Sequence, residues 1–162
     1  MCFGLEYDSA KFETAVRVSQ LHKDMENFVR GEDTVIGERG VNISGGQKAR
    51  ISLARAIYAD ADIYLLDDPL SAVDPEVASK IFSECIEGHL KDKIVVLVTH
   101  QLQFISNCEK ILVLKDNKQE ICAPYQAIQE QGMDLEAILK EYTTMMRKQS
   151  TLAPQKTFKS EA

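Results

Sequence analysis

Apolar side chains recur every three or four residues in three segments of the first sixty residues, which is the spacing of a helix with one buried face. Two of these segments predict helices before residue 30, the first around Phe12–Ser19 and the second around Leu21–Val29. The third segment runs from Gln47 to Tyr58 and follows Ser44-Gly45-Gly46. Serine is a favoured cap at the start of a helix and glycine lets the chain turn sharply, so we expect this helix to begin at Ser44.

Two later segments are short and apolar, as strands in the middle of a parallel sheet are. Ile63–Leu66 and Ile94–Thr99 are therefore predicted strands that are buried on both faces. Between them, Asp74-Pro75 predicts the start of a helix that ends near Gly88, because Asp caps helices and Pro fits the first turn. Strands that alternate with helices indicate an α/β fold with a mostly parallel sheet flanked by helices.

The last third of the chain is predicted to contain smaller elements. These are a short helix at 103–107, strands at 110–115 and 119–123 joined by a turn at 116–118, and helices at 125–131 and 135–146. Residues 149–162 are polar and lack periodicity, so we expect a disordered tail or linker there. One folded domain is expected to span residues 1–148.

Composition narrows the class of protein. The chain has a net charge of −6 with acids and bases interspersed, and no Lys/Arg cluster suggests a nucleic-acid-binding surface. The longest apolar run, Ile94–Val98, is far shorter than the roughly 20 residues of a membrane-spanning helix. No basic-then-apolar leader opens the sequence. The four cysteines lack C-x-x-C spacing, which favours reduced thiols over disulfides or a zinc site.

Three short segments carry candidate chemistry. Ser44-Gly45-Gly46-Gln47 would present backbone N–H groups to an anion at a helix start, although a plain glycine-rich cap explains the tetrapeptide equally well. Asp67 and Asp68 follow a predicted strand, where one could hold Mg²⁺ and the next could orient or deprotonate water, unless both are simply solvated. His100 follows the next strand and could contact a phosphate, although a lone histidine there is usually a polar cap. Ligands bind beyond the carboxyl ends of parallel strands, so we expect Asp67, Asp68 and His100 to share a site.

The order and spacing of these segments resemble those of ATP-binding-cassette (ABC) proteins. Residues 41–50, Val-Asn-Ile-Ser-Gly-Gly-Gln-Lys-Ala-Arg, resemble the signature motif of the family. Residues 63–68 resemble its Walker B strand, residues 71–74 its D-loop, His100 its switch histidine, and residues 34–40 the loop that exporters place before the signature. The resemblance covers roughly residues 1–148. It implies a partial P-loop NTPase domain, with a helical signature subdomain at about 8–58 and the remainder at 59–148.

A finer resemblance is to the first nucleotide-binding domain of the multidrug-resistance-associated transporters, which form the C subfamily of ABC exporters. It rests on residues 50–58 and 60–74, and above all on Asp68, where most family members carry Glu. Asp is one methylene shorter, and a general base must lie within about 3 Å of the proton it takes or act through water. A misplacement of about 1 Å can cost on the order of a hundredfold in rate. We therefore expect slow or absent hydrolysis at the site that Asp68 serves.

The resemblance also implies roles and partners, since two such domains of the family bind two ATP molecules head to tail. The cofactors would be ATP and Mg²⁺, and the partners a second nucleotide-binding domain and the transmembrane domains of the same transporter. Ser44, Gly45, Gly46 and Gln47 would contact ATP held by the second domain, and Asp74 would communicate across the dimer. Asp67 would hold Mg²⁺ through water, Asp68 would take the general-base position and His100 would touch the terminal phosphate. Glu38 and Arg39 would lie near the coupling helices of the transmembrane domains.

The resemblance places the chain at the cytoplasmic face of a membrane, with the plasma membrane favoured, and in contact with the membrane only through other domains. One motif of the family is missing from the 162 residues. The Walker A loop, G-x-x-x-x-G-K-[ST], wraps phosphates in backbone N–H groups and adds a lysine, but the chain contains no Gly-Lys pair. Met1–Leu5 resembles a point just after the glutamine loop of the family. We therefore expect an N-terminally truncated domain that is inactive alone and exposes an unpaired sheet edge.

Two other functions remain compatible with the residues. The chain could be a non-catalytic module that only completes the ATP site of a partner domain. It could also be the ATPase head of a chromosome-maintenance or DNA-repair protein, which shares the signature, Walker B and D-loop. That reading predicts a long coiled coil and often a basic DNA-facing surface, and neither is visible in the sequence. The transported solute is not encoded here, because the family contacts it through transmembrane domains.

Overall fold

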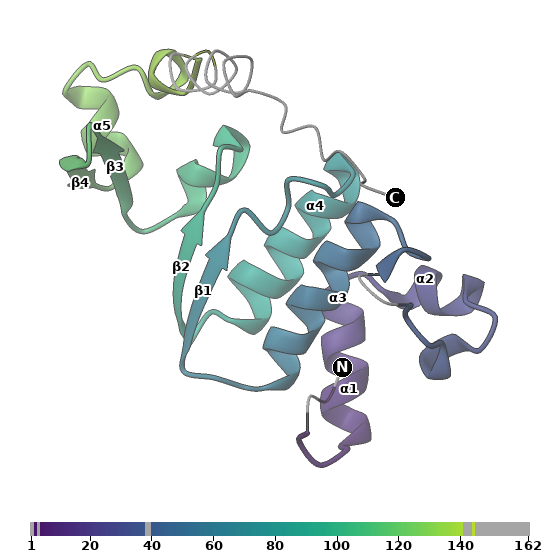
Figure 1. The fold of residues 1–162 in the computed structure, drawn as a ribbon. Coiled ribbons are helices and arrows are strands. Elements are labelled where there is room, and N and C mark those ends of the chain that lie inside the picture. The colour runs from purple at the N-terminus through teal and green to yellow at the C-terminus, as the bar shows by residue number, and fades with distance from the viewer. Residues whose placement is uncertain (1, 3, 38–39, 141–143, 145–162) are drawn as a thin grey trace, which may run out of the picture. The chain divides into compact units, whose positions relative to one another are not determined.

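The computed structural model describes residues 2, 4–37, 40–140 and 144. The chain forms two compact units, Met1–Thr99 and His100–Ala162 (Figure 1). The first unit holds most of the helices and a pair of parallel strands. The second holds an antiparallel hairpin and short helices. No helix among the described residues is both long and apolar enough to cross a membrane.

The helices of the first unit begin at side-chain caps in three cases. They are α1 (Ser9–Val18), α2 (His22–Asn27), the 3₁₀ turn η1 (Gly31–Asp33), α3 (Gly45–Tyr58) and α4 (Pro75–Ile81). Asp8, Ser44 and Asp74 accept hydrogen bonds from first-turn N–H groups of α1, α3 and α4. The two helices predicted before residue 30 and the caps predicted at Ser44 and Asp74 are confirmed. Val29 is wrongly placed in the second helix, because α2 ends at Asn27 and Val29 is 99% exposed.

The helix predicted to run from Asp74 to Gly88 changes character at its middle. Helix α4 continues into the π-helix η3 (Phe82–His89), in which the N–H of Leu90 donates to the carbonyl of Cys85 over 2.9 Å. The Gly88 backbone packs so tightly that a Cβ there would lie 3.1 Å from the carbonyl oxygen of Ser83. Glycine permits this close approach, and the wide π turn therefore fits where a larger residue would crowd the backbone.

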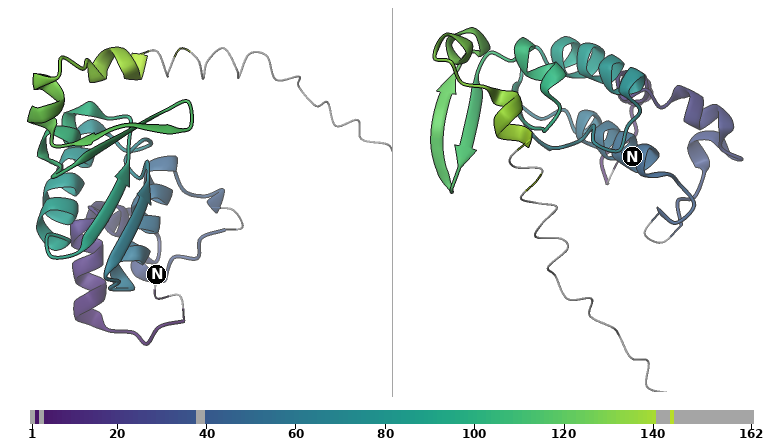
Figure 2. Two further views of the ribbon diagram at one scale, coloured as in Figure 1. Left: turned by 90° about the vertical axis from the view of Figure 1, so that its left-hand side faces the viewer. Right: turned by 90° about the horizontal axis from the view of Figure 1, so that it is seen from above.

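Strands β1 (Ile63–Asp67) and β2 (Ile94–Val98) form a parallel pair, with Ile63 opposite Ile94 and Asp67 opposite Val98. In Figures 1 and 2, helices α3 and α4 lie on one side of this pair. The expected parallel pairing is confirmed, but the expectation that the strands are buried on both faces is wrong for the described residues. Side chains alternate along a strand, and only one face of β1 is covered.

The exposure of successive β1 side chains makes this one-sided burial plain. Tyr64 and Leu66 are 4% and 8% exposed, whereas Leu65 between them is 76% exposed. The alternate residues of β2 are exposed in the same way, including Ile94 and Val96. No described residue buries this apolar sheet face of the first unit, which is unusual for parallel strands.

The core of the first unit lies among α1, α3, α4 and η3. Its fully or almost fully buried side chains include Ala15, Val18, Leu21, Leu53, Ala54, Ile57, Leu70, Ile81, Phe82 and Cys85. The face predicted for the helix 47–58 matches this packing, because Leu53 and Ile57 are buried on α3. This packing fixes α3 against α1 and so determines where the first turn of α3 lies.

The second unit contains the 3₁₀ helix η4 (Leu102–Asn107), the antiparallel strands β3 (Ile111–Lys115) and β4 (Lys118–Ala123), and α5 (Tyr125–Glu130). Residues 135–140 are also helical. The predicted turn is confirmed: Asp116 and Asn117 have φ values of 49° and 58°, which suit a tight hairpin. Most of 141–148 and all of 149–162 lie outside the described residues, so the predicted tail does too.

Candidate functional site

The first turn of α3 is held by a reciprocal cap between Ser44 and Gln47. The Ser44 Oγ accepts from the backbone N–H of Gln47 at 3.2 Å, and the Gln47 Oε1 accepts from the backbone N–H of Ser44 at 2.8 Å. The next N–H groups, those of Gly45 and Gly46, have no acceptor within the helix, as in the first turn of any α-helix. Such groups suit an anion, and the partial positive charge of the helix start adds to the attraction.

The loop at 71–74 packs directly against this first turn. A Cβ on Gly46 would lie 2.9 Å from the carbonyl oxygen of Ala72, while one on Gly45 would make an ordinary 3.6 Å contact with the Ala72 Cβ. Gly46 is therefore required for close packing of the two segments as well as for exposing the backbone. Asp74 ends this loop and caps α4 through the N–H of Glu76 at 3.0 Å. The structure thus brings the segment 44–47 and the segment 71–74 together.

The end of β1 carries the two predicted carboxylates. Asp67 is exposed and pairs with Val98 in register, while the backbone N–H of Asp68 donates to the carbonyl of Val98 at 2.8 Å. The carbonyl of Asp68 accepts from the N–H and hydroxyl of Ser71 at 3.3 and 2.9 Å. These bonds fix the turn that leads from β1 to the 71–74 loop.

Asp68 has a left-handed backbone conformation, with φ at 45°. Among non-glycine residues, Asp and Asn adopt this region most readily, because their short polar side chains interact with the local backbone. Sequence reasoning missed this feature. Pro69 disfavours the right-handed α region for Asp68, but it favours an extended backbone over the left-handed one, so no sequence signal indicated this conformation.

A second missed residue is Asp24 of α2. Its carboxylate accepts from the Gln47 Nε2 at 3.0 Å, and from the Nη2 and Nε of Arg50 at 2.6 and 3.2 Å. The Asp24 and Arg50 side chains are each only 13% exposed. Charged hydrogen bonds of this kind are stronger than neutral ones. No sequence spacing connects Asp24 with a helix that starts some twenty residues later, so only the fold could reveal the contact.

The other predicted site residues are placed less directly. His100 is an exposed residue that begins the second unit, and its expected place beside Asp67 and Asp68 stays a prediction. Glu38 and Arg39 lie outside the described residues. Two residues that flank this segment are joined by a hydrogen bond, in which the N–H of Gly37 donates to the Asn42 Oδ1 at 2.9 Å.

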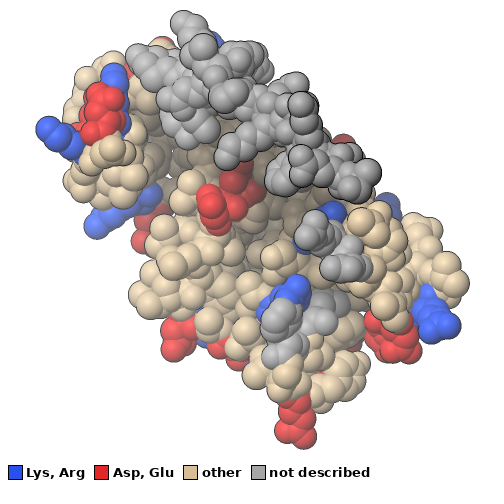
Figure 3. Space-filling model, in the orientation of Figure 1, with Lys and Arg blue, Asp and Glu red and all other residues tan. Residues whose placement is uncertain are grey.

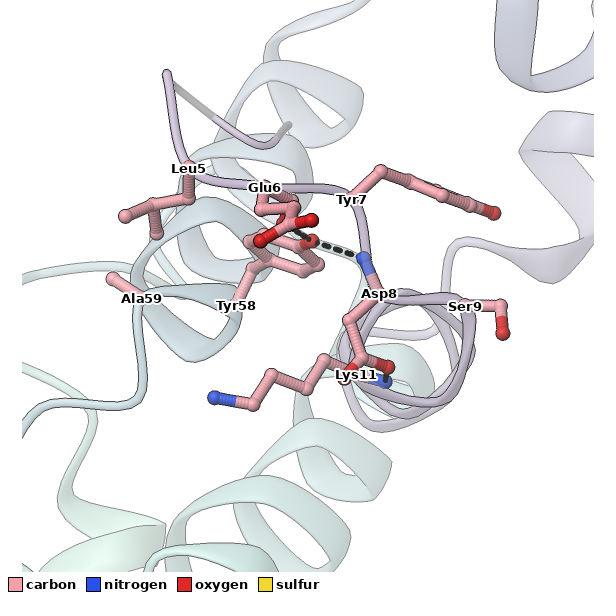
Figure 4. Close-up of a pocket in the computed structure, with 8 residues that line it drawn as sticks. All are labelled: Leu5, Glu6, Tyr7, Asp8, Ser9, Lys11, Tyr58 and Ala59. Atoms are coloured by element: carbon pink, nitrogen blue, oxygen red, sulfur yellow. Dashed lines mark hydrogen bonds between the residues drawn. The ribbon is translucent and has the colours of Figure 1, made fainter.

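A hollow of about 580 Å³ lies elsewhere in the first unit, between the start of the chain and the end of α3. Its lining residues are Leu5, Glu6, Tyr7, Asp8, Ser9, Lys11, Tyr58 and Ala59 (Figure 4). The Tyr58 hydroxyl donates to the carbonyl of Glu6 at 2.7 Å and accepts from the N–H of Asp8 at 2.8 Å. These bonds tie the first residues to α3. None of the predicted site residues lines the hollow.

Charged side chains of both signs are scattered over the face drawn in Figure 3, in keeping with the net charge of −6. Basic side chains do not gather into a patch on that face. A nucleic-acid-binding surface would require such a patch, because contacts to phosphates supply most of its affinity. This view therefore adds no support for a DNA-bound ATPase head.

Comparison with known proteins identifies the family. The family profile described as "ABC transporter" matches residues 6–71. The chain is similar to ABC transporter C family member 6 of Dictyostelium discoideum, with 51% identity over 139 residues. It is also similar to ATP-binding cassette sub-family C member 4 of Homo sapiens, with 48% identity over 139 residues, and to ABC transporter C family member 9 of Arabidopsis thaliana, with 45% over 137.

These alignments cover 85%, 86% and 85% of the chain, respectively. They cover only 10%, 10% and 9% of the relatives, so the chain spans about a tenth of their length. The match with the family profile includes the segment 44–47 and the strand that ends at Asp67. The chain therefore carries part of an ABC transporter domain, which has the P-loop NTPase fold, and its relatives are members of the ABC transporter C family.

Proposed function

We propose that this chain is part of the ATP-binding and ATP-hydrolysing module of a C-family ABC exporter. In this proposal the first turn of α3 contacts ATP held by a second nucleotide-binding domain. The chain's own carboxylates, Asp67 and Asp68, serve a nucleotide bound on its own side, together with His100. The module couples ATP to solute transport through transmembrane domains of the same transporter, and it works at the cytoplasmic face of a membrane, with the plasma membrane favoured.

The observation that carries this proposal is the close approach of the Ala72 carbonyl oxygen to Gly46, where an added Cβ would lie only 2.9 Å from that oxygen. It places the helix start at 44–47 and the loop at 71–74 side by side, so one surface can present both segments to a partner domain. The N–H groups of Gly45 and Gly46 suit the negatively charged end of a nucleotide. Asp74 lies at the end of the same loop, which fits a residue that senses the partner.

The residues at the end of β1 fit a magnesium nucleotide. Asp67 presents an exposed carboxylate beyond the strand, and hard oxygen ligands are the kind that Mg²⁺ prefers, often through water. Bound ATP would supply the scissile phosphate, and its Mg²⁺ would supply the positive charge that the Asp67 carboxylate offsets. Asp68 would orient a water molecule or accept a proton from it, but its short side chain reaches less far than that of Glu would.

We further propose that the 162-residue chain is inactive by itself. It contains no Gly-Lys pair, so it lacks the lysine with which a phosphate loop would hold ATP. The short side chain of Asp68 and the lack of a Gly-Lys pair also favour a second candidate function, in which the chain is non-catalytic and only completes the site of the second domain. Both candidates assign the same role to the segment 44–47.

The test compares substitutions in the full-length transporter that contains this segment, with ATP turnover as the readout. Gly46→Asp places a negative charge and a side chain where the nucleotide and Ala72 would lie, and we expect it to abolish turnover at the second site. Asp68→Glu is expected to raise turnover at the chain's own site, and Asp68→Asn to remove it. Unchanged turnover in Gly46→Asp would refute the proposal. Loss with Gly46→Asp but no response to either Asp68 substitution would select the non-catalytic candidate.

A further inference from the structure

We propose that Asp24 is a positioning residue for the first turn of α3, and that it acts through Gln47 rather than by touching a ligand. This inference rests on the proposed function of the segment 44–47. The residues concerned are connected in one chain of hydrogen bonds: Asp24 to Gln47, and Gln47 to Ser44. Asp24 lies 23 residues before Gln47 in the sequence, on a different helix.

The first step of the argument concerns the two ends of the Gln47 side chain. Its amide nitrogen donates to Asp24 at 3.0 Å, while its amide oxygen accepts from the N–H of Ser44 at 2.8 Å. A carboxylate accepts hydrogen bonds only, so Asp24 can face the nitrogen end but not the oxygen end. Asp24 therefore selects the orientation of the Gln47 amide in which the oxygen meets Ser44 and closes the cap.

The second step concerns Arg50, one turn further along α3. Its guanidinium donates to one carboxylate oxygen of Asp24 through two nitrogen atoms, at 2.6 and 3.2 Å, while Gln47 donates to the other oxygen. Both carboxylate oxygens are thus used, and Asp24 cannot rotate without breaking a charged hydrogen bond. Arg50 also lines the place where a Cβ on Gly46 would lie, at 3.3 Å. The cluster of Asp24, Gln47 and Arg50 therefore contacts the first turn of α3 on the side that faces α2.

The third step separates positioning from simple anchoring. Helix α2 has six residues, none of which is buried, so it contributes little to the apolar core. The polar cluster connects its central residue to α3 instead. A contact that only stabilised the fold would not need to select the orientation of Gln47. The arrangement instead fixes the cap that leaves the Gly45 and Gly46 N–H groups without an acceptor inside the helix.

The experiment compares Asp24→Asn with Glu26→Gln, which removes the same charge from an exposed position of α2. Asn presents an N–H₂ group to a cluster of donors, so it cannot satisfy both Gln47 and Arg50. In the full-length transporter we expect Asp24→Asn to lower turnover at saturating ATP by about tenfold, since small misplacements in such sites are costly. Glu26→Gln is expected to match the parent. Hydrogen exchange of the Ser44 and Gln47 amides, which close the cap, should be faster in Asp24→Asn alone.

A second comparison distinguishes positioning from loss of stability. In a Gln47→Leu background the link to Ser44 is already gone, so Asp24→Asn should lower turnover no further while still removing the Arg50 ion pair. Additive losses of turnover in the double variant would overturn the positioning role, as would equal behaviour of Asp24→Asn and Glu26→Gln. Gly46→Asp serves as the separate control: if it too leaves turnover unchanged, the proposed function of the segment 44–47 has failed, and not the role of Asp24.

Discussion

The carbonyl oxygen of Ala72 lies 2.9 Å from the position that a Cβ on Gly46 would occupy. Real Cβ atoms do not approach a backbone oxygen so closely, so any larger residue at position 46 must move either the helix or the loop. The neighbouring glycine is different, since a Cβ on Gly45 would meet the Ala72 Cβ at an ordinary 3.6 Å. Packing against the loop therefore requires glycine at position 46 but not at position 45.

The first prediction compares alanine at these two positions in the 162-residue chain. Gly46→Ala should lower the free energy of unfolding by about 1–3 kcal/mol, because overpacking forces the backbone to shift. Gly45→Ala should be neutral or should raise it by up to about 1 kcal/mol, because alanine favours the helix. Urea unfolding followed by circular dichroism measures both values. Equal stability of the two variants would contradict the packing that we describe between α3 and the 71–74 loop.

Local signals in the sequence predicted the start of α3 well. Ser44 and Asp74 cap helices through their own side chains, and the turn at Asp116 and Asn117 needs only positive φ values that these residues tolerate. Such features depend on a few neighbouring residues, so a pattern can reveal them. The burial of β1 depends instead on what covers each face. A run of apolar residues cannot tell whether one face or both are covered, and the prediction of two-sided burial was therefore wrong.

The second prediction uses the adjacent residues Leu65 and Leu66, which point to opposite faces of β1. Leu66→Ala should cost about 2–5 kcal/mol of unfolding free energy, because it leaves a cavity in the core. Leu65→Ala should change it by less than about 0.5 kcal/mol, because the side chain is exposed. Leu65→Ala should also reduce self-association, since it removes part of the exposed apolar patch. Light scattering and urea unfolding test both, and a large loss of stability in Leu65→Ala would mean that this face is covered.

The third prediction concerns pH. Hydrogen bonds from Lys11 and Lys93 lower the pKa of Asp60 below its ordinary value of 3.8. A carboxylate with a lowered folded-state pKa stabilises the fold above its unfolded-state pKa, and the contribution is lost as the pH falls through the folded-state value. Asp60→Asn should therefore flatten the fall of stability with pH below about pH 4. The side chain of Asp60 is about half exposed, so the effect should be small and should shrink further in high salt.

Thermal unfolding midpoints between pH 3 and pH 6 measure this effect, with Asp116→Asn in the distant β3–β4 turn as the matched control. Position 116 has positive φ, which Asn tolerates, so this substitution should leave the acid dependence of the parent in place. A steeper fall of the midpoint in Asp60→Asn than in the parent would reverse the sign that we derive from the ion pairs.

Some residues of the candidate site could be predicted from a sequence pattern, and others only from the fold. Ser44, Gly46 and Gln47 could be named from the sequence because they form one short motif. Asp24 could not, since it reaches Gln47 across 23 residues from a different helix. The left-handed residue Asp68 is likewise bonded through its N–H to Val98 of β2, a contact that the linear sequence does not show.

The fourth prediction uses the cysteines as reporters of the two units. Burial raises the pKa of the Cys85 thiol to about 12, whereas Cys122 on β4 is exposed. Only the thiolate reacts with alkylating agents, and a thiol with that pKa is roughly one part in ten thousand ionised at pH 8. Cys122 should therefore be alkylated by iodoacetamide within minutes in the native chain, and Cys85 should react only as fast as the first unit opens. Peptide mass spectrometry measures the two rates separately. In urea the rates should converge, because the core around Cys85 is lost, whereas fast labelling of Cys85 under native conditions would mean that η3 does not pack as described.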